Sequence, residues 1–234
     1  MPYKTFSNII CNVLIFLAIC FIIFVCFYSG GRYVFADTSV SPIYKGNDSS
    51  SGVALMFNVY QGSEYIPSIL DTLDEYGFKA TFFVGGCWAV ANEPLMSDIL
   101  SRGHEIGNHG FYHKDMARLS EEKNVDEIKN CNDVVLALTG YEIKLFAPPS
   151  GSFSDKTLSA AKSLGMTTIM WTKDTIDWRD KDKNVIYKRA TSGLSAGDLI
   201  LMHPTKATAE ALDDICKEII FKKLAAQTVS EVIR

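Results

Sequence analysis

Short apolar runs alternate with helical patterns along most of the chain. The apolar runs, each the length of one strand, lie at 53–57, 80–84, 143–147, 166–171 and 198–203, with a weaker one at 104–107. Between them, apolar residues spaced three and four apart predict helices over 66–76, 93–102, 120–139, 154–164 and 207–223. Glycines follow four of these helices as C-terminal stops, at Gly77, Gly103, Gly140 and Gly165. Continuous apolar strands alternating with helices predict an α/β fold with a parallel sheet covered on both faces.

The distinctive residues of the chain cluster near the ends of the predicted strands. They are Asn58, His109, Pro148, Asp177 and His203. No glycine-rich phosphate loop follows the first strand, so a distorted (β/α) barrel is favoured over an open nucleotide-binding sheet. In a barrel the carboxyl ends of the strands meet at one mouth, where these residues would converge.

The amino-terminal part of the chain differs from the rest. Residues 9–28 are almost entirely apolar, and at about 1.5 Å per residue a helix of this length spans a bilayer. We therefore expect a cytoplasmic end at 1–8, a single transmembrane anchor at 9–28, a flexible tether at 29–52 and a folded domain at 53–234. The alternative is a signal segment cleaved near Ala36. Either arrangement places the folded domain outside the cytoplasm, at the cell membrane or secreted.

Composition and charge exclude several classes of protein. With 47% hydrophobic and 21% charged residues the chain is typical of a packed globule rather than a disordered protein. The formal charge of −4 and the lack of a basic block argue against nucleic acid as a partner. Cys87, Cys131 and Cys216 lie outside the apolar segment and allow either one disulfide with a spare thiol or three buried thiols.

Each candidate residue taken alone has a simple structural explanation. His109 and His113, four residues apart, can hold one divalent ion, but they can equally be polar loop residues. His203 at the end of an apolar strand can be a satisfied core group. Asp177 can cap a turn, and Pro148 can simply make a turn rigid.

The order of the motifs is more specific than any one of them. The series runs Phe57-Asn58 to Gly62, then NHGFYH, FAPPSG, DTIDW and LMH. From about Val53 to the carboxyl end it resembles the NodB-type polysaccharide deacetylases, carbohydrate esterase family 4. The first motif is also similar to that of a divergent, sporulation-associated branch of this family.

The resemblance implies a fold, a reaction and a set of site residues. The fold would be a distorted (β/α) barrel, and the reaction would be metal-dependent removal of N-acetyl groups from a peptidoglycan- or chitin-like glycan. The cofactor would be zinc, with cobalt or nickel as alternatives. Matched position by position, the retained residues are His109 and His113 for the metal, His203 for the general acid, Asp177 for its orientation, and Trp178, Leu201 and Pro148 for the substrate pocket.

The chain departs from the family in the half of the site that activates water. Asn58 stands where the family has its base, Val59 where it has a carboxylate ligand, and Ala147 where it has an arginine beside the base. An amide cannot accept a proton at a useful pH, and two histidines are fewer than the three ligands usual for catalytic zinc.

A carboxylate from elsewhere could replace the missing one. Glu64 follows the longer first turn and could supply the ligand or the base, although it could also only favour a helix start. Asp174 and Asp115 are weaker candidates.

Three functional hypotheses follow from this pattern. The first is a membrane-anchored deacetylase with a modified site. The second is a catalytically impaired relative that binds cell-wall glycan, and the third is a hydrolase acting on another small amide.

Overall fold

The computed structural model describes residues 16–21, 41–47 and 52–234 of the chain. The chain divides into two compact units, 1–39 and 40–234. In the first unit residues 16–21 are helical. The rest of the predicted membrane segment 9–28, and most of the predicted tether, lie outside the described residues. Within the described part of the chain, no helix is both long and apolar enough to cross a membrane.

The second unit is built on one parallel sheet. Its strands follow the order β5-β4-β3-β2-β1-β7-β6, and β8 pairs with the start of β1. Every pairing between these strands is parallel. The bounds are β1 Gly52–Val59, β2 Thr81–Val84, β3 Glu105–Asn108, β4 Leu145–Phe146, β5 Thr167–Thr168, β6 Lys173–Asp174, β7 Leu199–Met202 and β8 Ala225–Gln227.

The predicted barrel is an open one. The end strands β5 and β6 are not paired with each other, so the sheet is a curled half-barrel within the described residues. Next to β5 the chain before β1 adds one short bridge, in which the Ile43 N–H donates to the Thr168 carbonyl at 2.9 Å. The strand predictions near 53–57, 80–84, 104–107, 143–147, 166–171 and 198–203 are confirmed, although β4 and β5 are each only two residues long.

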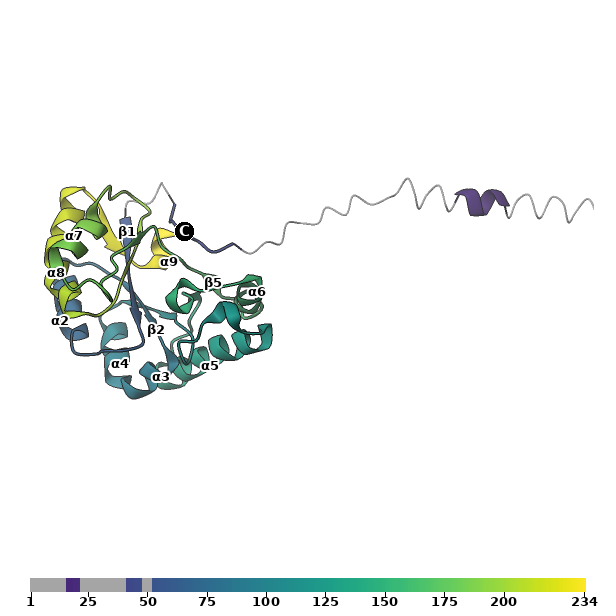
Figure 1. Cartoon of the computed structure of the whole chain (residues 1–234), viewed down its shortest axis with the longest axis horizontal. Helices are drawn as coiled ribbons and strands as arrows, with labels where there is room; N and C mark the ends of the chain where they lie inside the picture. The colour runs from purple at the N-terminus through teal and green to yellow at the C-terminus, as the bar shows by residue number, and fades with distance from the viewer. Residues whose placement is uncertain (1–15, 22–40, 48–51) are drawn as a thin grey trace, which may run out of the picture. The chain divides into compact units, whose positions relative to one another are not determined.

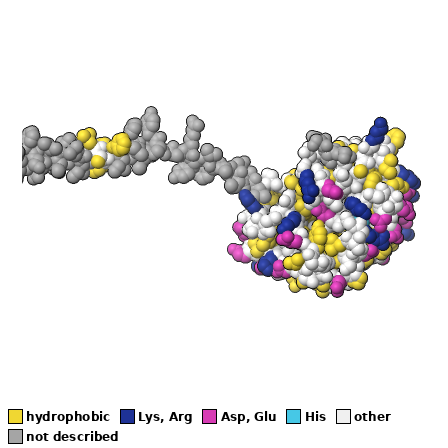
Figure 2. All heavy atoms as spheres, turned by 180° about the vertical axis from the view of Figure 1, so that it is seen from behind, with side chains coloured by type: hydrophobic (Ala, Val, Ile, Leu, Met, Phe, Trp, Pro, Cys, Tyr) yellow, Lys and Arg dark blue, Asp and Glu magenta, His cyan; other side chains and the backbone are white. Residues whose placement is uncertain are grey.

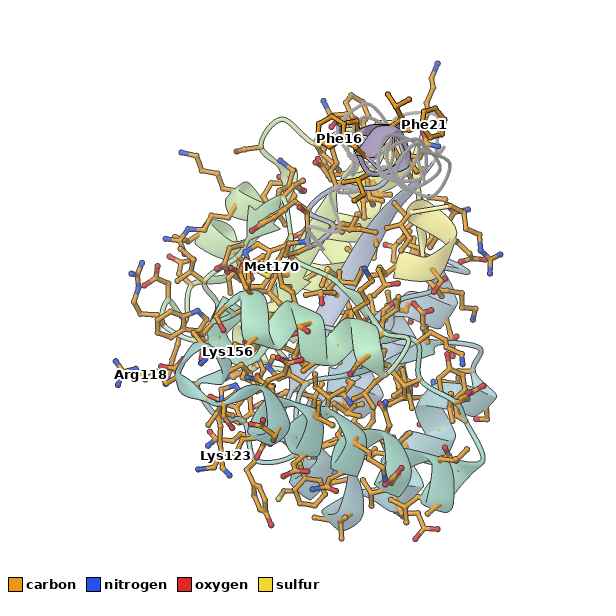
Figure 3. The ribbon with its side chains drawn as sticks, turned by 90° about the vertical axis from the view of Figure 1, so that its right-hand side faces the viewer. Phe16, Phe21, Arg118, Lys123, Lys156 and Met170 are labelled. Atoms are coloured by element: carbon orange, nitrogen blue, oxygen red, sulfur yellow. The ribbon has the colours of Figure 1, made fainter. Side chains whose placement is uncertain are left out.

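Helices cover the outside of the sheet (Figure 1). Their bounds are α2 Ile66–Glu75, α3 Gly86–Ala91, α4 Glu93–Ser101, α5 Glu121–Thr139, α6 Asp155–Ser163, α7 Lys183–Thr191, α8 Lys206–Phe221 and α9 Val229–Val232, with short 3₁₀ turns at Met116–Arg118 and Pro149–Gly151. α5 begins where the Ser120 side chain accepts from the Lys123 N–H, and it ends at Gly140, whose φ is 70°. α5 packs against α6, and Lys123 and Lys156 mark the two helices in Figure 3. The pattern did not predict α3, α7 and α9.

Alternation along β1 separates two apolar layers. Val53, Leu55, Phe57 and Val59 belong to the large core between the sheet and the helices. Ala54 and Met56 belong to a smaller cluster on the other face of the strand. Because side chains alternate along a strand, Asn58 follows Met56 on that second face, at the carboxyl end of β1. One polar residue therefore stands at the end of an otherwise apolar row.

The three cysteines of this unit are free thiols. Cys131 and Cys216 are buried and Cys87 is exposed, so neither sequence-based alternative for the thiols holds in full. On the face shown in Figure 2, acidic and basic side chains are interspersed. This mixed surface agrees with the lack of a basic block in the sequence.

Candidate active site

A pocket of about 380 Å³ opens at the carboxyl ends of the strands. It is lined by Asn58, Tyr60, His109, His113, Ser150, Trp171, Asp174, Trp178, Leu201 and His203. These residues come from the ends of β1, β3, β4, β5, β6 and β7 or from the loops that follow them. The structure therefore brings together most of the residues that the sequence placed after separate strands.

Two neutral histidines form one side of the pocket. The ring centres of His109 and His113 lie 5.1 Å apart. The His109 Nδ1 lies 2.8 Å from the Ala147 carbonyl oxygen, which can only accept, so Nδ1 carries the proton and Nε2 keeps its lone pair. Burial lowers the pKa of His109 to about 3 and also lowers the pKa of His113. Both imidazoles are therefore in the form that can bind a metal ion near neutral pH.

A buried carboxylate from α5 holds the loop that carries these histidines. Glu127 Oε2 accepts from the backbone N–H of Phe111 at 3.0 Å and of Tyr112 at 2.8 Å. Its other oxygen lies 3.1 Å from Lys114 Nζ. On the other side of the loop, the Gly86 and Cys87 N–H groups at the start of α3 donate to loop carbonyls. Hydrogen bonds from two helices thus fix the loop. Within it, His113 has a φ of 55°.

We expect the Glu127→Gln substitution to lower the free energy of unfolding by about 1–3 kcal/mol, because a buried charge-assisted bond pair is weakened. Urea unfolding of the two forms measures the difference. Asp126→Asn is the matched control, since Asp126 is exposed on the same helix. Equal losses in the two variants would contradict the role given to Glu127.

His203, which also lines the pocket, is paired with a carboxylate. Asp177 is buried, and its Oδ1 lies 2.7 Å from His203 Nδ1. The other oxygen, Oδ2, accepts from the His203 backbone N–H at 2.7 Å and from the Thr208 hydroxyl at 2.5 Å. These contacts fix the His203 ring with Nδ1 protonated toward the carboxylate, which leaves Nε2 for a ligand.

Two apolar side chains complete this side of the pocket. Leu201, in β7, is almost fully buried, whereas Trp178 is 60% exposed. Pro148 is buried at the start of the Pro149–Gly151 turn and does not line the pocket. The turn that it begins places Ser150, with a φ of 54°, at the pocket wall.

The first motif places no carboxylate in the pocket. Val59 is fully buried among the core residues under the helices, and Ala147 is fully buried as well. Tyr60, which the sequence analysis did not single out, lines the pocket instead. Its ring stacks on the His113 imidazole with ring centres 3.6 Å apart and planes 20° from parallel.

The substitute carboxylates lie in different places. Glu64 is exposed and lines a neighbouring hollow rather than the pocket with the histidines. Its carboxylate accepts from the Ser63 N–H at 3.2 Å, and backbone hydrogen bonds lower its pKa. Asp115 binds the Ser152 hydroxyl and Arg118. Asp174 does line the pocket, and its Oδ1 accepts from the Ile176 N–H at 2.8 Å. The structure thus brings Asp174, but not Glu64 or Asp115, into the wall of the pocket.

The residues present provide a partial set of metal ligands. In the described ranges no group of three His, Cys, Asp or Glu side chains gathers where it could hold an ion. The two imidazoles do share the pocket with Asn58, whose Oδ1 is buried and has no hydrogen-bond donor among the described residues. The candidate ligands that share the pocket are therefore two imidazoles and one side-chain amide.

Several supporting residues were missed by sequence reasoning. Glu127, Asn108 and Thr208 hold the site from outside, and Trp171 lines it. The Asn108 side chain accepts from the Gly110 N–H at 2.7 Å and donates to the Ile128 carbonyl. Asn108 directly precedes His109, and this position in the sequence could have indicated its supporting role. Glu127 and Thr208 lie on helices far along the chain and carry no such signal.

Comparisons with known proteins agree with this site. The family model described as polysaccharide deacetylase matches residues 45–169. The Bacillus subtilis protein YlxY, described as uncharacterized, is 41% identical over 82% of this chain and 60% of its own length. The peptidoglycan-N-acetylmuramic acid deacetylase PdaA of Bacillus subtilis is 32% identical over 75% of this chain and 69% of its own length. The chain spans less than two thirds of YlxY and 42% of the Listeria monocytogenes peptidoglycan-N-acetylglucosamine deacetylase PgdA.

Solved structures give the same result. A crystal structure of a CE4 family pseudoenzyme from Bacillus anthracis has 37% identity and a TM-score of 0.81, and it covers 85% of this chain and 71% of its own. A mutant of that pseudoenzyme with restored enzymatic activity matches at 35% identity, with the same TM-score, over 85% of this chain and 73% of its own. On the family match and on these relatives together, the chain belongs to the polysaccharide deacetylase family.

Proposed function

We propose that the domain binds N-acetylated cell-wall glycan in this pocket and hydrolyses it only slowly. The observation that carries the proposal is the buried Asn58 at the position of the family's base. An amide cannot take a proton from water, and general-base assistance contributes typically about 10²–10⁴-fold to such a reaction. The pseudoenzyme relative from Bacillus anthracis supports the same view.

Recognition would use the half of the pocket that the chain retains. Leu201 and the exposed ring of Trp178 offer an apolar wall for an acetyl methyl or a sugar face. His203 lines the same pocket as His109 and His113. Its Nε2 would hydrogen-bond the amide of the N-acetyl group or protonate a leaving amine. Asp177 would hold His203 in the required tautomer.

The proposal includes a divalent ion at His109 and His113, with zinc first and cobalt or nickel as alternatives. When bound, such an ion polarises an amide carbonyl as a Lewis acid. The neutral state of both imidazoles supports this assignment.

Active deacetylation is the second candidate function. It is favoured by the bonded set of Asp177, His203 and Thr208, because a pocket without any catalytic use has no need for an oriented proton donor. In this case another group in the pocket wall, such as Asp174, would have to act as base. The sporulation-associated branch stays a prediction under both candidates.

We also propose that residues 9–28 anchor the chain in the cell membrane with the domain outside the cytoplasm. The support is the apolar character of this segment. The alternative remains secretion after cleavage near Ala36. Amino-terminal sequencing of the mature chain distinguishes the two, since only cleavage yields a chain that begins near Asp37.

Glycan binding can be tested with the full chain and soluble N-acetylglucosamine oligosaccharides and peptidoglycan fragments. We expect saturable binding by calorimetry, and acetate release at least a hundredfold slower than that of an active relative assayed in parallel. Trp178→Ala should weaken binding about tenfold, because a large exposed contact is removed. Phe221→Ala is the control, as Phe221 is 75% exposed on α8 and does not line this pocket.

Two outcomes would count against the proposal. No binding to any of the N-acetylated glycans would remove the glycan-binding function. Acetate release as fast as that of the active relative would favour the second candidate instead.

A further inference from the structure

We propose that Asn58 Oδ1 completes a divalent-cation site with His109 and His113, in which a neutral amide oxygen takes the place of a carboxylate. The inference goes beyond the proposed glycan binding and can be tested without any glycan. In this inference Asn58 acts as a metal ligand and does not merely mark the position of a missing base.

The first observation is the spacing of the two histidines. In a tetrahedral site with Zn–N bonds of about 2.1 Å, two imidazole ring centres lie roughly 5 Å apart. The observed separation is 5.1 Å. The bond from His109 Nδ1 to the Ala147 carbonyl leaves the His109 Nε2 lone pair available, as in metal-bound histidines whose other nitrogen donates to a carbonyl. The separation of the two ring centres therefore matches the spacing expected for two ligands of one ion.

The second observation is the unpaired oxygen of Asn58. This residue is 3% exposed, and its Oδ1 has no hydrogen-bond donor among the described residues. A buried polar atom without a partner costs about 1–3 kcal/mol, so such atoms generally have a water, an ion or a functional reason. Asn58 lines the same pocket as both histidines, and side-chain amide oxygens are known ligands of divalent cations.

The third observation is the support around the donors. Tyr60 covers one face of the His113 ring, and Glu127 fixes the backbone of Phe111 and Tyr112 that leads to it. Asn58 itself is held at the end of β1, a central strand paired on both sides. All three donors thus lie on fixed parts of the fold, which keeps the cost of ordering them low.

The ligand set predicts the character of the site. Two nitrogens and a neutral oxygen favour Zn²⁺, Co²⁺ and Ni²⁺ over Mg²⁺ and Ca²⁺. Without a carboxylate, the bound ion keeps its full positive charge, and affinity should be lower than in a site that contains one. Replacing the amide by a carboxylate of the same size should therefore tighten binding.

The experiment is a titration of the full chain with Co²⁺ alone, followed by visible absorption and by metal content after gel filtration. We expect about one ion per chain. Asn58→Ala should weaken the affinity at least tenfold, Asn58→Asp should tighten it at least tenfold, and His109→Ala should abolish it. Asn184→Ala, at an exposed asparagine on α7, and His104→Asn, at a histidine outside the pocket, should leave the affinity unchanged.

The outcomes decide the inference in either direction. An Asn58→Ala affinity equal to that of the unchanged chain would overturn it and would indicate a water on Asn58 instead. The same holds if the unchanged chain binds no ion while Asn58→Asp does. Thermal unfolding shows whether the Asn58→Ala variant is folded. If it is not, the inference is tested by Asn58→Asp alone, because this substitution hardly changes the size of the side chain. Because no glycan is present, failure here is separate from failure of glycan binding, which is measured with a chelator added.

Discussion

The Asn58→Asp variant should release acetate from N-acetylated glycan at least a hundredfold faster than the unchanged chain when Zn²⁺ or Co²⁺ is supplied. A carboxylate at this position can accept the proton of the attacking water, which the amide cannot do. Its two oxygens allow one to face an ion while the other takes the proton. The proposed proton donor needs no further change, because His203 is already held by Asp177 and lines the same pocket as the histidine pair.

The comparison needs a variant that adds a carboxylate elsewhere in the same motif. Gln61→Glu serves this purpose, since Gln61 is exposed and lies outside the pocket. It should leave acetate release unchanged. Adding His203→Ala to Asn58→Asp should remove most of the gain. Should Asn58→Asp be no faster than the unchanged chain, the missing base is not what limits hydrolysis, and the proposed cause of low activity is wrong. In the Bacillus anthracis pseudoenzyme, enzymatic activity has been restored by mutation.

The second large effect concerns the pH dependence of stability, through a histidine at the opposite ends of the strands. His104 is buried, and its Nδ1 accepts from the Ala80 N–H at 3.2 Å. Burial lowers its pKa to about 4. In the unfolded chain the pKa returns to about 6.5, so between these values the unfolded state binds a proton that the folded state excludes. The contribution of neutral His104 to the free energy of unfolding is therefore fully present above pH 6.5, and it is lost as the pH falls toward 4.

We expect the free energy of unfolding to fall by about 2–3 kcal/mol through this histidine when the pH is lowered from 7 to 4.5. His104→Asn provides the test, because its side-chain oxygen can still accept from the Ala80 N–H but does not titrate. Urea unfolding of both forms at the two pH values gives the difference, and other titrating groups cancel between them. If both forms lose the same free energy on acidification, His104 is not buried as a neutral group.

Under the proposed function the two halves of the site differ. On the side proposed to hold the leaving group, Asp177, His203 and Thr208 form a connected hydrogen-bond set. On the side proposed to activate water, Asn58 and Tyr60 line the pocket and neither is a carboxylate. Val59 lies in the core and cannot provide one. A pocket with an oriented histidine and without a base at position 58 supports the proposed binding of an N-acetyl group over rapid turnover.

The sequence alone determined the class of fold and part of the pocket, including Asn58, His109, His113 and His203. Period-3.6 spacing and terminal signals such as Ser120 and Gly140 were enough for the long helices, because caps and amphipathic faces are local properties. The longer apolar strands were equally readable. Polar residues after strand ends pointed to a shared mouth, since parallel strands of one sheet end on the same edge.

Only the tertiary structure decided how the pocket is completed. β6 and β8 are two and three residues long, and they exist because neighbouring strands supply their hydrogen bonds, so no local pattern marks them. The stacking of Tyr60 on His113, the hold of Glu127 on the histidine loop and the position of Glu64 outside the pocket depend on how separate segments meet. The same is true of the unpaired Asn58 oxygen, because whether a polar atom finds a partner depends on every segment packed around it.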